Sequence, residues 1–288
     1  MGGIILYKLL LLLFLSCTLL AGCSDSEHST YDSSEPIKEA KIFAKGLISE
    51  DLVAAPRFSP DGKTLFFHKP DRLSGHYQIF VSYYIDDAWT KPELPEFAIS
   101  EASEGDMYFT PDGTKLFFVS NRESGFPERQ WNYGLWVVDR TATGWGKPTY
   151  LSDAVNSYND NIAYPTVASN GNLYFLTSEG INLSRFIDGK YQPREVLKLA
   201  EITPEQIFIP YIAHDESYLI QTGLEPSSEA PMFIRYNRNG VWSKPKQLSS
   251  KLIGGRFAFV SPDGQYLFFS KDDGIYQIEM SETGIEGT

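Results

Sequence analysis

The sequence predicts an all-β protein, most simply a β-propeller of five four-stranded blades. Three observations predict this fold class: a turn motif recurs at intervals of 45–58 residues, short apolar segments flank each copy, and one further strand-like segment precedes the first copy. A unit of this size cannot bury its apolar faces alone, so neighbouring copies must stack against one another. A closed ring of such units leaves no strand edge exposed.

Residues 1–22 are predicted to be a signal peptide. Lys8 precedes an apolar run of about 14 residues, which is shorter than the ~20 residues that a membrane-spanning helix needs. The run ends in "LAGC", which resembles the bacterial lipobox and implies a diacylglycerol group on Cys23. The residues before Cys17 fit that motif poorly. Ser24 after the cysteine implies sorting to the outer membrane, so we expect a lipid-anchored protein of the bacterial cell envelope that faces the periplasm.

Residues 23–37 are predicted to be a flexible acylated tether, because this segment is rich in Ser, Asp and Glu and nearly free of aliphatic residues. The propeller domain then covers residues 38–288. The formal net charge of −12 argues against nucleic acid as a partner and against direct electrostatic adhesion to anionic lipid. With Cys23 acylated and Cys17 removed with the signal, disulfides and zinc–thiolate sites are excluded.

The repeated turn is clearest as "SPDG" or "TPDG" around Asp61, Asp112 and Asp263, and Asn170 and Asp215 occupy the same position in two degenerate copies. Proline fixes φ at the second turn position, aspartate suits the third, and glycine accepts the left-handed conformation that begins the next strand. Each turn is therefore predicted to join the innermost strand of a blade to its second strand.

The segments around each turn predict the other strands. A short apolar segment such as "AAPRF" precedes the turn, a segment apolar on both faces such as "KTLFF" follows it, and an alternating segment such as "YQIFVS" comes third. A recurring Trp-x-Lys-Pro begins at Trp89, Trp145 and Trp242. It suits an outer edge strand, because proline and lysine discourage pairing with another chain. We interpret these tryptophans as residues that pack the blades rather than as a ligand cage.

The fifth unit lacks an outer strand, since only "SETGIEGT" follows its third strand. The segment "EAKIFAKGL", which begins at Glu39, lies before the first unit and has the character of the missing strand. We therefore predict that this N-terminal strand completes the last blade and closes the ring.

The "PDG" turns followed by "LFF" resemble the repeat of TolB-type, WD-like propellers over nearly the whole domain. The stretch "YLSDAVNSYNDNIAYPTVASNGNLYFLTS" is similar to the blade junctions of periplasmic lipoproteins of this class. The third and fourth copies depart from the consensus turn, with Ser-Asn-Gly and His-Asp-Glu. The resemblance implies a binding or assembly platform, although one fold of this kind hosts many functions.

Known catalytic motifs do not stand out. The sequence contains no Gly-x-Ser-x-Gly elbow, phosphate-binding loop, His-Glu-x-x-His or EF-hand spacing. The histidines are scattered without the spacing of metal ligands; they are His28, His68, His76 and His214. We interpret them as satisfied or solvent-facing side chains, and we expect neither a metal nor a cofactor.

Charged residues near the starts of the predicted inner strands are the candidate ligand-binding residues, because the blades there ring one mouth of the central channel. They are Asp51, Arg57, Glu104, Asp106, Asp160, Glu205 and Arg256. Glycosidases use two carboxylates in this way, one as an acid and the other as a base or nucleophile. The open alternative is that these loops are polar only because they contact water.

One loop, residues 121–134, lengthens the second unit and combines aromatic and guanidinium side chains. Its candidate binding residues are Arg122, Phe126, Arg129, Trp131 and Tyr133. Such a combination suits sugar stacking or a protein hot spot. It suits equally a loop that folds over its own blade.

Together these observations predict a non-catalytic, membrane-tethered monomer that binds an envelope protein or a glycan. The alternative is a carbohydrate-active hydrolase or lyase that uses two of the carboxylates Asp51, Asp106, Asp160 and Glu205.

Overall fold

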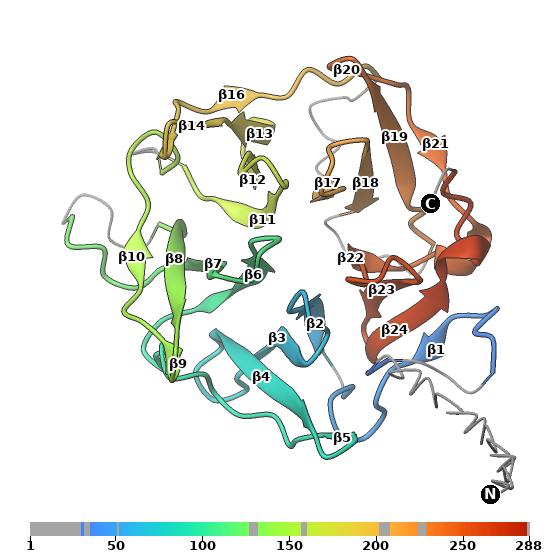
Figure 1. Ribbon diagram of the computed structural model, residues 1–288, viewed down its shortest axis with the longest axis horizontal. Coiled ribbons are helices and arrows are strands. Elements are labelled where there is room, and N and C mark those ends of the chain that lie inside the picture. Colours follow the sequence, from blue (N-terminus) through green and yellow to red (C-terminus); the bar gives the residue numbers. More distant parts are fainter. Residues whose placement is uncertain are drawn as a thin grey trace, which may run out of the picture.

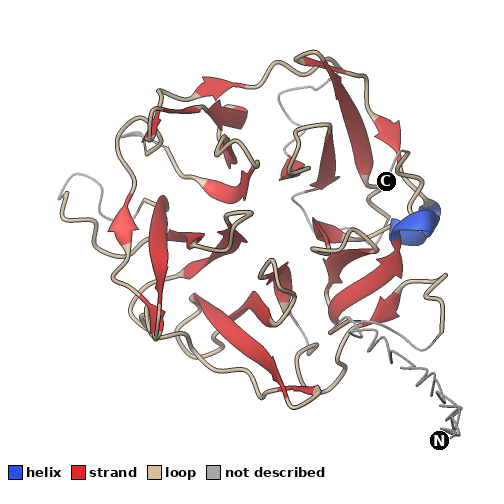
Figure 2. Ribbon diagram, viewed as in Figure 1, coloured by secondary structure: helices blue, strands red, loops and turns tan. Residues whose placement is uncertain are grey.

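The computed structural model describes residues 30–31, 35–50, 52–126, 132–156, 160–201, 208–223 and 229–286. Its described strands form five antiparallel sheets arranged as blades around a central axis, and one further two-stranded hairpin (Figure 1). Helix in the described residues is confined to short 3-10 turns, including η2 (Ser250–Leu252) and η3 (Met280–Glu282), as Figure 2 shows. The predicted all-β fold with five blades is confirmed.

The strands of each blade follow one another from the axis to the rim. Blade 1 contains β2 (Ala54–Phe58), β3 (Thr64–Pro70), β4 (Tyr77–Ile85) and β5 (Ala88–Trp89). Blade 2 contains β6 (Glu104–Phe109), β7 (Lys115–Ser120), β8 (Gly134–Thr141), β9 (Gly144–Trp145) and β10 (Thr149–Tyr150). Blade 3 contains β11 (Ala163–Val167), β12 (Leu173–Thr177), β13 (Gly180–Ser184) and β16 (Glu195–Val196), with the small hairpin of β14 (Phe186–Ile187) and β15 (Lys190–Tyr191).

The last two blades complete the ring. Blade 4 contains β17 (Phe208–Ile212), β18 (Tyr218–Gly223), β19 (Phe233–Arg238), β20 (Val241–Trp242) and β21 (Lys246–Gln247). Blade 5 contains β22 (Arg256–Val260), β23 (Tyr266–Lys271), β24 (Gly274–Glu279) and the N-terminal β1 (Lys41–Ile42).

The ring closes as the sequence predicts. Strand β1 pairs antiparallel with β24, with Lys41 opposite Gln277 and Ile42 opposite Tyr276. In Figure 1 the blue β1 lies beside the red β24. Because the outer strand of the last blade comes from the N-terminal end of the domain, blade 5 joins the two ends of the folded chain without a covalent bond.

Two residues of the predicted tether, Tyr31 and Ile37, are buried against the propeller. The Tyr31 ring packs edge-on against Phe58 and Phe268, with ring centroids 5.2 and 5.8 Å away. The hydroxyl of the preceding Thr30 donates a hydrogen bond of 2.6 Å to the carbonyl of Gly62. Contacts with the propeller therefore begin before residue 38, at the seam between blades 5 and 1.

All five predicted turns have the same hydrogen bond, in which the side chain at the Asp position accepts from the backbone N–H two residues later. The distances are 2.9–3.0 Å for Asp61, Asp112, Asn170, Asp215 and Asp263. The degenerate copies thus keep the turn, since asparagine offers the same carbonyl-type oxygen as aspartate.

The tryptophans of the Trp-x-Lys-Pro segments pack the blades. Trp89 lies edge-on to Phe58 at 5.8 Å, and Trp145 lies edge-on to Phe66 of the neighbouring blade at 5.8 Å. Trp242 is also buried, in an apolar cluster shared by blades 3 and 4. In the part of the chain that the structure describes, no helix is both long and apolar enough to cross a bilayer.

Candidate functional site

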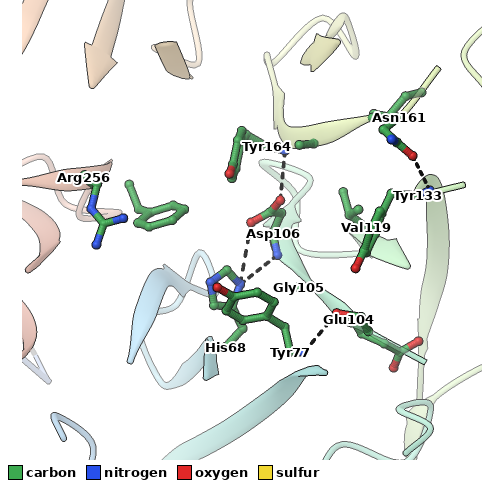
Figure 3. A pocket seen from close by; sticks show the side chains of 14 residues that line it. His68, Tyr77, Glu104, Gly105, Asp106, Val119, Tyr133, Asn161, Tyr164 and Arg256 are labelled. Atoms are coloured by element: carbon green, nitrogen blue, oxygen red, sulfur yellow. Dashed lines mark hydrogen bonds and ion pairs between the residues drawn. The ribbon is translucent and has the colours of Figure 1, made fainter. Parts of the chain in front are cut away.

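A cavity of about 470 Å³ lies at the mouth of the channel, where the innermost strands begin. Its walls come from the starts of β6, β11 and β22 and from the end of β3 (Figure 3). Aromatic and polar side chains line it together; they include Tyr77, Tyr133, Tyr164, Phe257, His68, Asp106, Asn161 and Arg256. This volume lies within the roughly 300–1,000 Å³ of ordinary ligand pockets.

Asp106 is the acidic member of an otherwise apolar ring. Aligning the innermost strands by their turns places it at the same level as one residue of each other blade, namely Ala55, Tyr164, Ile209 and Phe257. Apart from Asp106, these residues belong to or pack against one apolar cluster. A carboxyl group at this level therefore needs an explanation other than packing.

The backbone of Asp106 has a positive φ of 50°, but this conformation is a property of the blades. The inner strands β2, β6, β11 and β22 each contain a register shift against the second strand of their blade. Ala55, Tyr164 and Phe257 have φ of 52–57° at the equivalent positions. A β-bulge bends the strand and re-aims its side chains. The conformation directs the Asp106 side chain without itself indicating function.

The Asp106 carboxyl group is only partly satisfied. Its Oδ2 accepts a hydrogen bond of 3.3 Å from the Tyr164 backbone N–H, whereas Oδ1 has no hydrogen-bond partner in the described part of the chain. The side chain is 11% exposed, at the wall of the cavity. Burial raises its pKa to about 7, although the Tyr164 hydrogen bond and the charge of Arg57 both act to lower it. Near neutral pH this group can therefore both donate and accept.

His68 lies beside Asp106, with Nδ1 3.6 Å from Oδ1. The same Nδ1 accepts a hydrogen bond of 3.3 Å from the Asp106 backbone N–H, so this nitrogen carries no proton. Burial, with the charges of Arg57 and Arg256, lowers the pKa of His68 to about 3. The contact in Figure 3 is thus between a neutral imidazole and a carboxyl group, and it is not an ion pair at neutral pH.

Glu104 borders the cavity but is held by other groups. Its Oε1 accepts from Arg122 Nε and the Ser120 hydroxyl, both at 2.8 Å, and Arg122 Nη2 also contacts it. Its Oε2 accepts from the Ile99 backbone N–H at 3.1 Å. The Arg122 guanidinium also stacks over the Phe118 ring at 4.9 Å. These two predicted binding residues form one buried ion pair that connects the start of β6 to the loop after β7.

The other predicted mouth residues are dispersed. Asp160 binds Arg194 at 3.0 Å and does not line the cavity. Arg256 lines the cavity and binds Asp272 at 2.9 Å. Arg57 lies deeper in the channel. Asp51 and Glu205 lie outside the described residues.

The predicted binding loop is partly described. Tyr133 lines the cavity, and its backbone N–H donates to Asn161 Oδ1 at 2.9 Å. Phe126 is 45% exposed and lies 6.0 Å from the Tyr150 ring. Arg129 and Trp131 lie outside the described residues. The described part of this loop thus contributes one ring to the cavity.

Several cavity residues belong to no motif in the sequence pattern, in particular Tyr77, Asn161, Tyr164 and Phe257, and His68 also stands without metal-ligand spacing there. Two of them, Tyr164 and Phe257, could have been found by aligning the inner strands on their turns, because they occupy the position of Asp106. Among the described residues no group of three His, Cys, Asp or Glu side chains is placed to hold a metal ion.

Sequence comparison finds no matching family model and no matching curated protein. Solved structures with a similar fold include the catalytic domain of an α-L-arabinofuranosidase of family GH62 from Coprinopsis cinerea. It has a TM-score of 0.53 and 6% identity, over 87% of this chain and 96% of that one. A thermostable family-43 glycoside hydrolase has a TM-score of 0.50 and 10% identity, over 85% of this chain and 96% of that one.

TolB from Acinetobacter baumannii is also similar, with a TM-score of 0.49 and 13% identity over 81% of this chain. The chain spans about half of the TolB structure, 55% of its length. At these identities the likeness to all three proteins concerns the fold, and a propeller of one fold can serve unrelated functions.

Proposed function

We propose that this protein is a lipid-anchored binding platform of the bacterial envelope that takes a glycan or a protein segment into the mouth cavity. The observation that carries the proposal is the Asp106 carboxyl group, which is buried at the cavity wall with Oδ1 free of hydrogen bonds from the described residues. A buried polar atom without a partner is unfavourable. A ligand that donates a hydrogen bond to Oδ1 would remove this penalty.

The surrounding side chains fit a ligand with both polar and apolar faces. The Tyr164 and Phe257 rings lie 5.7 Å apart at the cavity, and Tyr77 and Tyr133 provide two further rings on its wall. Aromatic rings offer large apolar area at low conformational entropy, and their hydroxyls add hydrogen bonds. Sugar rings and the side chains of a bound polypeptide both present this combination.

The described carboxylates favour binding over hydrolysis. A glycosidase needs two carboxyl groups about 5–9 Å apart, one of them free to act as base or nucleophile. Asp160 is paired with Arg194 and Glu104 with Arg122, so Asp106 is left without a second unpaired carboxylate among the described mouth residues. The hydrolase alternative retains one supporting feature, since a carboxyl group with a pKa of about 7 suits a general acid.

Ligand capture by Asp106 is tested with the chain from residue 24 onward, incubated with envelope extract and with a glycan array. Asp106→Asn is expected to lose at least tenfold in affinity for the captured ligand, because a hydrogen bond to a charged group contributes about 1.5–3 kcal/mol. Asp139→Asn is the matched control, since Asp139 is 66% exposed on the far side of its blade. Equal retention by both variants would rule out the mouth cavity. Glycan cleavage that Asp106→Asn abolishes would establish the hydrolase alternative.

The lipid anchor determines which way the cavity faces. Thr30 and Tyr31 contact the turn side of blades 5 and 1, whereas the cavity lies at the opposite ends of the inner strands. The seven residue-to-residue steps from Cys23 to Thr30 span at most about 25 Å. The propeller disc is thicker than this, since the nine residues of β4, which run from one face to the other, span about 30 Å. The anchor is therefore too short to turn the disc over, and the cavity opens away from the membrane into the periplasm.

A lipid-bound quencher in vesicles distinguishes the two faces. In the lipidated protein, a fluorophore on Lys63→Cys, in the turn after β2, is expected to be quenched more strongly than one on Leu73→Cys, in the loop after β3. Mass spectrometry of the same sample should find the diacylglycerol group on Cys23. An unmodified Cys23 would contradict the anchor, and stronger quenching at residue 73 would contradict the orientation.

A further inference from the structure

Arg57 is a buried cation inside the channel, below the mouth cavity. Arg57 is 2% exposed. No described carboxylate lies within ion-pair distance of it, although the charge of Asp106 acts on it from the cavity wall. Its Nη1 donates to the carbonyls of Pro56 and Phe257, at 2.7 and 3.5 Å. A charge in such a position is unfavourable unless an opposite charge accompanies it.

Side chains from different blades meet around Arg57. Its guanidinium carbon lies 5.5 Å from the Tyr108 ring centre and 5.3 Å from that of Phe259. The Tyr108 and Phe259 rings are 6.3 Å apart, and Tyr211 lies 6.1 Å from Phe259. These residues belong to blades 1, 2, 4 and 5, so contacts between non-adjacent blades must cross the channel. Together with Thr166 of blade 3 they occupy one level of the inner strands, two residues beyond Asp106.

Three hydrogen-bond donors at this level have no partner in the described residues. They are Arg57 Nε, the Tyr108 hydroxyl and the Thr166 hydroxyl. Tyr108 lies beside Tyr211, whose side chain acts to lower the pKa of the Tyr108 hydroxyl. Tyr108 and Thr166 are at most 1% exposed. The three donors come from successive blades, at equivalent positions of β2, β6 and β11.

Arg122 and Arg235 each have an acceptor for Nε, which Arg57 lacks among the described residues. Arg122 binds the carboxylate of Glu104. Arg235, which is 1% exposed, donates from Nε to Gln221 and from Nη1 to the carbonyls of Ala200 and Ser243. The contrast indicates that the environment of Arg57 is completed by something other than these side chains.

We propose that the propeller axis holds one small inorganic anion of the size of chloride, bound by Arg57 Nε and the hydroxyls of Tyr108 and Thr166. One positive charge and three donors at the same level of successive inner strands suit a small anion. A metal cation would be repelled by the guanidinium. A water molecule could accept some of the hydrogen bonds but would add no negative charge to that of Asp106, which also acts on Arg57. The site is separate from the mouth cavity and does not depend on the function proposed for that cavity.

Bromide is the probe for locating this anion, because it has the same charge as chloride and scatters anomalously. Crystals grown in sodium bromide are expected to show an anomalous peak at hydrogen-bonding distance from Arg57 Nε and from the hydroxyls of Tyr108 and Thr166. Peaks confined to surface lysines, with the axis empty or holding only water, would overturn the proposal.

Thermal unfolding tests the same site in solution. At constant ionic strength, replacing a bulky organic sulfonate by chloride is expected to raise Tm by about 3–5 °C for each tenfold increase above the dissociation constant. Thr166→Val and Tyr108→Phe each remove one hydroxyl, so each should raise about tenfold the chloride concentration that is needed for the same increase in Tm. Arg57→Met should abolish it.

Tyr174→Phe is the control, because this hydroxyl, on the second strand of blade 3, donates at 2.8 Å to Glu216 in the β17–β18 turn of blade 4. It is expected to lower Tm without changing the halide effect. A Tm that is equal in chloride and in the sulfonate would contradict the proposal. So would a halide effect that is unchanged in Thr166→Val and Tyr108→Phe, and these two variants decide the question even if Arg57→Met does not fold.

Discussion

Glu104→Ala is expected to lower the free energy of unfolding by about 3–5 kcal/mol, because it leaves Arg122 as a buried charge without its partner. The side chains of Glu104 and Arg122 are 1% and 9% exposed, so water cannot take over the lost contacts. The Ser120 hydroxyl and the Ile99 N–H lose their acceptor as well. Urea unfolding monitored by tryptophan fluorescence measures the change.

The exposed pair of Arg185 and Glu195 provides the control, since these side chains are 55% and 59% exposed. Glu195→Ala should change the free energy of unfolding by less than about 1 kcal/mol. Replacing both partners, as in Glu104→Leu with Arg122→Met, should recover much of the loss, because no uncompensated charge remains. If Glu104→Ala costs no more than Glu195→Ala, the pair does not have the structural role described above.

In Asp106→Asn, the free energy of unfolding is expected to fall by about 2–3 kcal/mol as the pH falls from 6.5 to 4.5. In the folded protein the pKa of His68 is lowered from 6.5 to about 3, so stability due to His68 is lost as the pH falls below 6.5. The pKa of Asp106 is raised from 3.8 to about 7, so stability due to Asp106 is lost as the pH rises from about 4 to about 7.

In the wild type these two effects oppose one another. Between about pH 4 and 6.5 the folded pair carries one proton, on Asp106, and the unfolded pair also carries one, on His68. The pair then contributes no slope to stability in this range, since stability depends on pH only when the two states bind different numbers of protons. Asp106→Asn removes the contribution of Asp106 and leaves that of His68. The free energy of unfolding then falls by about 1.4 kcal/mol for each pH unit of acidification.

His68→Leu should reveal the opposite slope, with stability falling as the pH rises from 4.5 to 7. The measurement is the free energy of unfolding in urea at several pH values, each variant being compared with the wild type so that other titrating groups cancel. Parallel curves for the wild type and Asp106→Asn would show that the pKa values of this pair are not shifted as described.

The blades, their number and the closing strand could be predicted from the sequence because they depend on local patterns. The turn at Asp61 or Asp263 needs only its own few residues, and even the degenerate turns at Asn170 and Asp215 keep the same hydrogen bond. The closing strand could be predicted from a count, since the last unit lacks one strand and a spare strand precedes the first.

The candidate site could be predicted only in part. Glu104 and Asp106 are two residues apart, and both were candidates because of their place at the start of an inner strand. Only the structure distinguishes them: Glu104 meets Arg122 from the loop after β7, whereas Asp106 is placed against Tyr164 of blade 3 and His68 of blade 1. Whether a carboxylate is neutralised depends on which groups the other strands and blades bring near it.

The sequence by itself thus determined the repeat, the turn chemistry and the closure of the ring, because periodicity and turn residues act over a few positions along one strand. Only the tertiary structure decided which charges are paired, where the mouth cavity lies, and that Arg57 stands among rings from several blades. The physical reason is that burial and electrostatic partners come from other strands and other blades, between residues 18 to 200 positions apart in the chain, and no local pattern records them.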